Sequence, residues 1–80
     1  MSYILTSDDD AFIKGALAHG QFTIPQIALN LIMSHAGGDS GRALFLCKEA
    51  LIHAMTPLGN PAFQPLLKVG AFLEEGKPLV

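Results

Sequence analysis

The fold of this chain is decided by its central stretch, residues 23–55, which reads TIPQIALNLIMSHAGGDSGRALFLCKEALIHAM. It consists of two apolar segments on either side of the glycine pair Gly37–Gly38. In each segment apolar residues recur at three- and four-residue spacing, which is typical of a helix. Glycine is rare inside helices and common just past their ends. The stretch therefore predicts two consecutive helices joined by a short turn.

The ends of these two helices carry recognisable signals. Thr23 and Gln26 form a T-x-x-Q capping-box pattern, which predicts that the first helix begins there and continues to the glycine pair. Asp39 or Ser40 can act as the N-cap of the second helix, which we expect to reach Met55.

Helices are also predicted on both sides of the central stretch. Residues 7–10 supply N-cap candidates and acids for a helix over residues 11–19, with Gly20 following its C-terminus. Thr56–Pro57 ends the preceding helix, and residues 57–65 form a proline-rich loop. A last helix begins near Pro65 and ends at Gly76. The fold class is thus all-α: a compact bundle of about four short helices, with the proline-rich loop before the last one.

Composition restricts the class of protein. Eighty residues suit one domain, residues 1–80. Half of them are hydrophobic and 15% are charged, against roughly 25% in an ordinary soluble domain. This balance excludes a disordered chain, and the single cysteine excludes a disulfide scaffold. A net charge of −2 argues against nucleic acid as a partner.

We expect neither a signal peptide nor a membrane span. Residues 1–10 lack a basic n-region and a continuous apolar segment. The longest run without Lys, Arg, Asp or Glu, residues 15–38, could reach across a bilayer but contains histidines, amides and Pro25. The sequence therefore predicts a cytoplasmic protein.

Helical wheels place apolar residues on more than one side of the two central helices. In the first, the stripe expected to face the core is followed by a narrow polar strip and then by a second apolar set. In the second, nearly everything outside a polar strip is apolar. The predicted core stripe of the first helix comprises Ile24, Ile27, Ala28, Leu31 and Ile32. The predicted protein-contact residues are Leu29, Met33, Phe45 and Ile52, with Phe72 of the last helix as a further candidate.

One short segment resembles an enzyme motif. Residues 38–41, GDSG, are similar to the nucleophile segment of trypsin-like serine proteases. That chemistry needs a positioned histidine, a buried aspartate and an oxyanion hole on a pair of β-barrels, for which this chain is too short and too helical. We interpret the segment as an interhelical turn with a capping residue, and predict no catalytic residue and no enzymatic activity.

Other reactive side chains do not form a local ligand motif. His19, His35 and His53 are far apart in sequence and each lies near the end of a predicted helix, where capping or packing is expected. A proton-linked or partner-contacting role of His35 stays open. Cys47 lies in an apolar run and is interpreted as a core residue, and residues 8–10 lack the spacing of an EF-hand loop. We predict no metal and no cofactor.

Two functions follow as hypotheses. The first is a small non-catalytic protein-interaction protein, a homodimer that binds and modulates a partner protein as an adaptor, a chaperone-like protein or an inhibitor. The alternative is a DNA-binding regulator, because residues 23–31 resemble the first helix of a helix-turn-helix unit. Its recognition helix would fall on residues 35–46, which contain three glycines and one basic residue, Arg42.

Overall fold

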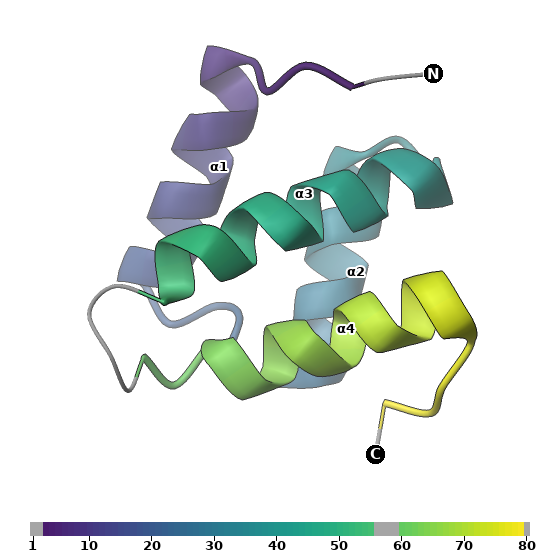
Figure 1. Ribbon diagram of the computed structural model, residues 1–80. Helices are drawn as coiled ribbons and strands as arrows, with labels where there is room; N and C mark the ends of the chain where they lie inside the picture. Colours follow the sequence, from purple (N-terminus) through teal and green to yellow (C-terminus); the bar gives the residue numbers. More distant parts are fainter. Residues whose placement is uncertain (1–2, 56–59, 80) are drawn as a thin grey trace.

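The computed structural model describes residues 3–55 and 60–79 and confirms the all-α fold class. It contains four helices: α1 (Ser7–Ala18), α2 (Pro25–His35), α3 (Ser40–Ala54) and α4 (Phe63–Glu75) (Figure 1). The described chain has no strand, and residues 3–6 form an irregular arm. The predicted helix end at Thr56–Pro57 and the start of the proline-rich loop lie outside the described residues.

The helices pack around α3. Figure 1 shows α3 and α4 running side by side in opposite directions, with α2 behind both of them and α1 against the other side of α3. The core is filled by small and branched side chains from all four helices and by Phe22 of the α1–α2 connection. Its buried residues include Ile13, Ala28, Ile32, Ala43, Leu46, Cys47, Ala50, Leu66 and Val69. Many are alanines, and such small side chains let the helices approach closely.

α1 begins earlier than predicted. Its N-cap is Thr6, whose hydroxyl accepts a hydrogen bond from the Asp9 backbone N–H, while the Asp9 carboxylate accepts one from the Thr6 N–H. This reciprocal capping box satisfies two backbone donors that a helix N-terminus otherwise leaves free. The acids at positions 8–10 therefore lie in the first turn of the helix, not before it.

The capping box predicted for α2 is absent. Pro25 occupies the first turn, so the N-cap is Ile24, one residue beyond Thr23. The Thr23 hydroxyl instead donates to the Gly20 carbonyl at 2.9 Å, and the Gln26 amide donates to Asn30. The prediction was wrong because Pro25 fixes the start of the helix at a position where Thr23 is too early to cap it.

The turn between α2 and α3 has the form that the sequence predicts. Gly37 and Gly38 both have positive φ, 69° and 83°, a conformation that side chains with a Cβ rarely adopt. Asp39 is the N-cap of α3, and its carboxylate accepts hydrogen bonds from the backbone N–H groups of Gly41 and Arg42. The GDSG segment is therefore a turn and a helix cap, as interpreted.

α4 begins two residues before Pro65 and ends at the expected glycine. Asn60 accepts a hydrogen bond from the Ala62 N–H at 2.9 Å and so shapes the turn that leads into the helix. Gly76 follows the last helical residue in the left-handed conformation, with φ 72°. Within the described residues no helix has both the length and the apolar character that crossing a membrane requires.

The orientation of α2 differs from the predicted one. Ala28 and Ile32 of the predicted core stripe are buried, but Ile24 and Ile27 are about half exposed. Leu29, from the opposite apolar set, takes their place in the core. The difference arises because α2 packs against α3 and α4 together, which turns its buried side toward Leu29.

Candidate functional site

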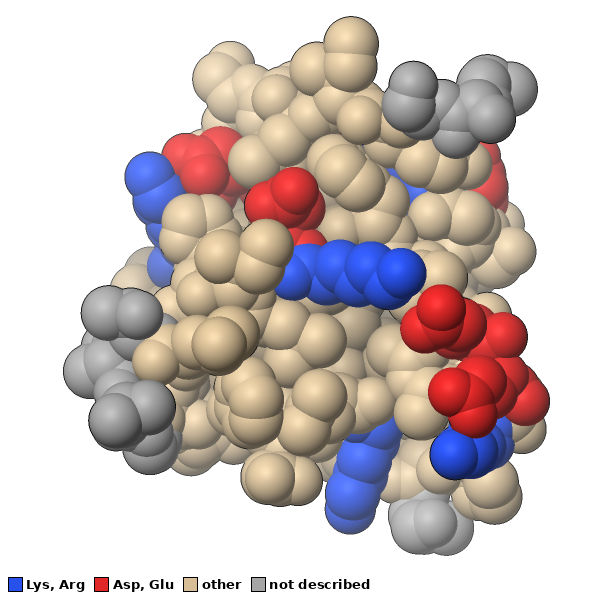
Figure 2. All heavy atoms as spheres, in the orientation of Figure 1, with Lys and Arg blue, Asp and Glu red and all other residues tan. Residues whose placement is uncertain are grey.

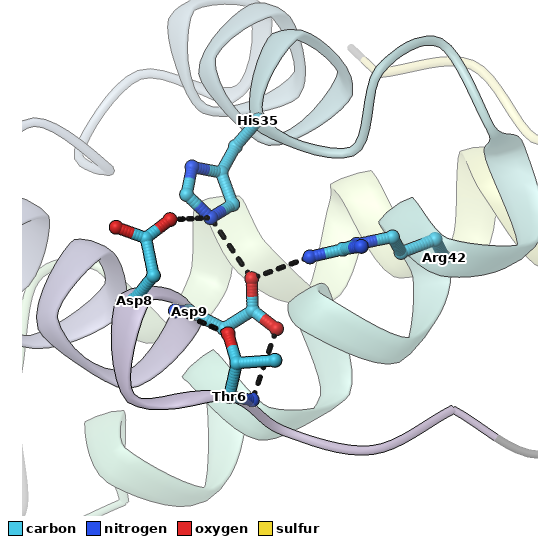
Figure 3. Close-up of polar contacts among 5 residues, drawn as sticks. All are labelled: Thr6, Asp8, Asp9, His35 and Arg42. Atoms are coloured by element: carbon cyan, nitrogen blue, oxygen red, sulfur yellow. Dashed lines mark hydrogen bonds and ion pairs between the residues drawn. The ribbon is translucent and has the colours of Figure 1, made fainter.

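The most unusual residue of the fold is a buried carboxylate at the start of α1. Asp9 is 1% exposed and is the one buried polar or charged residue in the described chain. Its partners come from three places in the sequence: the arm before α1, the end of α2 and the first turn of α3. We call these residues, Thr6, Asp8, Asp9, His35 and Arg42, the Asp9 cluster (Figure 3).

Both oxygens of Asp9 have partners. Oδ1 accepts from Arg42 Nη2 at 2.6 Å and from His35 Nε2 at 2.9 Å, and Oδ2 accepts from the Thr6 N–H at 3.2 Å. Because a carboxylate can only accept, His35 carries a hydrogen on Nε2. Charge-assisted bonds of this kind are among the stronger hydrogen bonds in proteins. Asp9 thus joins α1 to α2 and α3 through one side chain.

His35 is held by more than its bond to Asp9. Its ring stacks parallel to Phe12, with centroids 4.2 Å apart, and its Nε2 lies 3.6 Å from the exposed Asp8 carboxylate. As the last residue of α2, it also lies at the negative end of the helix dipole. The prediction that His35 packs at a helix end is confirmed.

The cluster keeps Asp9 ionised. Burial favours the neutral acid, but hydrogen bonds from Thr6, Arg42 and His35 favour the carboxylate and outweigh it. The result is a pKa of Asp9 lowered from 3.8 to about 2. The side chain therefore carries its negative charge throughout the physiological range.

Three groups of the cluster are of types that bind metals. Asp8, Asp9 and His35 offer ligand atoms within 4.8 Å of one another. However, Arg42 lies 2.6 Å from Asp9 Oδ1, the same oxygen that binds His35, and its positive charge would repel a cation there. The geometry favours a structural role for the cluster, in which Asp9 holds α1 against α2 and α3.

The remaining candidate reactive side chains, His19, His53 and Cys47, each contact another group of the protein. His19 Nδ1 lies 2.8 Å from the Gly15 carbonyl one turn earlier, and His53 lies 3.6 Å from Asp10 of α1. The Cys47 thiol donates to the Leu66 carbonyl at 3.1 Å. Burial raises the pKa of Cys47 to about 12, which makes the thiol a poor nucleophile.

The five predicted contact residues are in different surroundings. Leu29, at 8% exposure, is part of the core and not of an exposed surface. Met33 and Phe45 are half-buried, and Phe45 is covered by the stacked ring of Tyr3. Ile52 is 61% exposed and Phe72 is 40% exposed. α3 carries Phe45 and Ile52 on the same side, since they are two turns apart.

The structure adds residues that the sequence alone did not single out. Met55, one turn after Ile52, is 55% exposed, and Leu67 of α4 is 40% exposed. Leu67 lies on α4, and Met55 follows the last residue of α3 as its C-cap. Figure 2 shows the side of the molecule on which α3 and α4 lie: uncharged atoms cover most of it, with charged side chains across its middle and along its right edge. We define the α3–α4 face by its members Tyr3, Phe45, Lys48, Ile52, Met55, Leu67 and Glu74. The spacing of 52 and 55 was visible in the sequence, but the position of α4 beside them was not.

The chain matches no protein-family model, and searches among curated proteins and solved structures find no similar chain.

Proposed function

We propose that this chain is a small non-catalytic protein-interaction protein, a homodimer that binds and modulates a partner protein through apolar helix faces. The observation that carries the proposal is the α3–α4 face. Ile52, Met55 and Leu67 are large apolar side chains on two adjacent helices, and all three are at least 40% exposed. Exposed apolar patches larger than a few hundred Å² often mark interaction sites, and these three exposed side chains support the proposal for that reason.

The charges of the molecule support association. Several form pairs within the chain, at 2.9 Å between Lys14 and Asp10 and at 3.0 Å between Lys77 and Glu75. The net charge of −2 leaves little repulsion between two copies. A cytoplasmic location is part of the same proposal, as is a role as adaptor, chaperone-like protein or inhibitor.

The homodimer is tested by sedimentation velocity across a wide range of protein concentration. We expect the average mass to rise from that of one chain toward that of two. A single species of monomer mass at every concentration would refute the homodimer.

The partner is tested by affinity capture from the native cell lysate, with the wild-type chain and two variants as bait. Ile52→Glu changes the α3–α4 face, and Ile27→Glu places the same charge on α2. We expect specific proteins to bind the wild type and Ile27→Glu but not Ile52→Glu. Equal capture by all three would show that the α3–α4 face has no part in partner binding.

The DNA-binding alternative finds little support in the geometry. Residues 36–39, which a recognition helix over 35–46 would include, form a turn between α2 and α3. Arg42 is bound to Asp9, and Lys48 lies 3.7 Å from Glu74, so neither is well placed to contact phosphates. Retention on duplex DNA at low salt, lost as salt is raised, would favour this alternative over our proposal.

A further inference from the structure

The arm before α1 is attached to the rest of the molecule at two places. Near α1, the Thr6 backbone N–H donates to the Asp9 carboxylate at 3.2 Å, and Leu5 packs against the core. At its other end, Tyr3 contacts the beginning of α3. Between these two places Ile4 is 83% exposed. The arm therefore has a fixed end next to α1 and a distal end whose position depends on the contacts of Tyr3 (Figure 1).

The first turns of α3 form a site that fits the Tyr3 side chain. The Tyr3 ring stacks on Phe45, with centroids 5.7 Å apart and an interplanar angle of 26°. Its hydroxyl lies 3.4 Å from Oδ2 of Asp39, the residue that caps α3. A Cβ at position 41 would lie 2.6 Å from the hydroxyl oxygen, closer than Cβ atoms approach other atoms. The ring fits this site because residue 41 is a glycine.

The contacts of Tyr3 are few, and losing them leaves the helices intact. An aromatic pair favours the docked ring by roughly two- to ten-fold. The hydroxyl contact adds little, because 3.4 Å is long for a hydrogen bond between two oxygens. When the ring leaves, Asp39 still accepts from the backbone N–H groups of Gly41 and Arg42 and so still caps α3. Release of the ring thus costs one stacked pair and no helical hydrogen bond.

We propose that the arm is a hinged strap, which closes over the start of α3 and opens while the four helices stay folded. In the closed state Tyr3 covers Phe45, and in the open state Tyr3 and Ile4 extend into solvent and Phe45 is uncovered. The strap acts within one chain, so it does not depend on the proposed homodimer or on a partner. A chain that is monomeric at every concentration would refute the homodimer and leave the strap unaffected.

The test is limited digestion with chymotrypsin, which cleaves after aromatic residues, with mass spectrometry to follow cleavage of the Tyr3–Ile4 bond. Gly41→Ala places a methyl group against the Tyr3 hydroxyl, the movable end of a side chain, so the ring is displaced and the fold is kept. We expect cleavage at this bond to become roughly two- to ten-fold faster, because its rate follows the open fraction. Gly15→Ala is the matched control, since a Cβ there meets nothing within 4 Å, and should leave the rate unchanged.

Removing the hydroxyl tests the assigned site more closely. In Tyr3→Phe the nearest ring atom to a Cβ at position 41 is Cζ, at 3.5 Å, an ordinary contact distance. The ring can then stay docked beside an alanine, and chymotrypsin still recognises it. We therefore expect Gly41→Ala to speed cleavage in the wild-type chain but not in the Tyr3→Phe chain. Equal acceleration in both chains would overturn the assigned site.

A destabilising variant separates opening of the strap from unfolding of the chain. Leu66→Ala removes a fully buried side chain of α4, so it raises the unfolded fraction without touching the arm. We expect it to leave cleavage at the Tyr3–Ile4 bond unchanged. Acceleration by Leu66→Ala, or no acceleration by Gly41→Ala, would overturn the strap. Circular dichroism establishes that each variant is folded, and Val69→Ala, a smaller change at the same buried side of α4, replaces Leu66→Ala if that variant is not.

Discussion

The two sides of α3 are held by different kinds of interaction. On the side of α1, the buried Asp9 carboxylate binds Arg42 of α3 and His35 of α2. On the side of α4, the contacts are mainly apolar, with Leu66 and Val69 fully buried and the Cys47 thiol as a polar contact. The α1 side therefore loses stability when Asp9 is protonated, and its directional hydrogen bonds fix the orientation of α1 relative to α2 and α3. The stability of the α4 side depends instead on how well apolar side chains fill the space between α3 and α4.

The largest expected effect concerns Cys47 on the apolar side. The pKa raised from 9.0 to about 12 lowers the thiolate fraction near neutral pH about 1,000-fold. We expect a disulfide reagent to label the folded chain at least that much more slowly than the chain in denaturant. Labelling at the rate of an unfolded peptide would show that α3 and α4 separate readily.

The next largest effect is a loss of stability caused by a cavity between α3 and α4. Leu66→Ala removes a fully buried side chain and should lower the free energy of unfolding by about 3 kcal/mol, more than 100-fold in the folding equilibrium. Urea unfolding measures it, with the partly exposed neighbour Leu67→Ala as the control, expected to cost less than about 1 kcal/mol. Similar losses for the two variants would contradict the described packing of α4.

The Asp9 cluster should give a somewhat smaller effect that depends on pH. Asp9→Asn leaves Arg42 without its counter-charge and should cost about 2 to 3 kcal/mol at neutral pH, less than a fully buried pair because Arg42 is partly exposed. Urea unfolding again measures it. Asp10→Asn, one residue away and partly exposed, should cost less than about 1 kcal/mol.

The pH dependence follows from the lowered pKa of Asp9. A carboxyl with a folded pKa of about 2 against an ordinary 3.8 stabilises the fold fully above pH 4 and loses this contribution as pH falls through 2. The loss amounts to about 2 kcal/mol in the wild type. We expect Asp9→Asn to lack this step, so an unchanged acid profile in that variant would show that other carboxyls cause it.

The smallest effect should be stabilising. Gly70 lies inside α4, and a Cβ there would be 3.6 Å from Cys47 Sγ, an ordinary van der Waals distance. Gly70→Ala should raise stability by about 0.5 to 1 kcal/mol, because alanine restricts the unfolded chain and favours the helix. A rise in thermal midpoint would measure it, and a fall would show that the α3–α4 contact has no room for a methyl group.

Local signals predicted the fold well. The signals that worked determine the backbone conformation only within a few residues of their own positions; they are Gly37–Gly38, Asp39 and Gly76. The sequence therefore predicted the α2–α3 turn, the start of α3 and the end of α4 correctly. The prediction that Thr23 caps α2 was wrong because Pro25 places the helix start one residue later, with Ile24 as the N-cap. The rotation of α2 depends on its contacts with two other helices, and for this reason the exposure of Ile27 and the burial of Leu29 were not predicted.

Most of the Asp9 cluster could not be predicted from the sequence. His35 and Arg42 are 26 and 33 residues from Asp9, and no local spacing connects them. One signal was present: Thr6 and Asp9 have the spacing of a capping box, which would have placed Asp9 inside the first turn of α1. Its burial, however, depends on the helices that pack over it.

The sequence separations in the Asp9 cluster also bear on the order of folding. The Cys47–Leu66 contact joins α3 and α4 across 19 residues, whereas the cluster closes loops of 26 and 33 residues to bring α1 onto α2 and α3. We therefore expect the α3–α4 pair to form in the folding transition state and the cluster to form after it. Asp9→Asn should then speed unfolding and leave the folding rate nearly unchanged. On this expectation, the buried Asp9 carboxylate affects the unfolding rate of the chain far more than its folding rate.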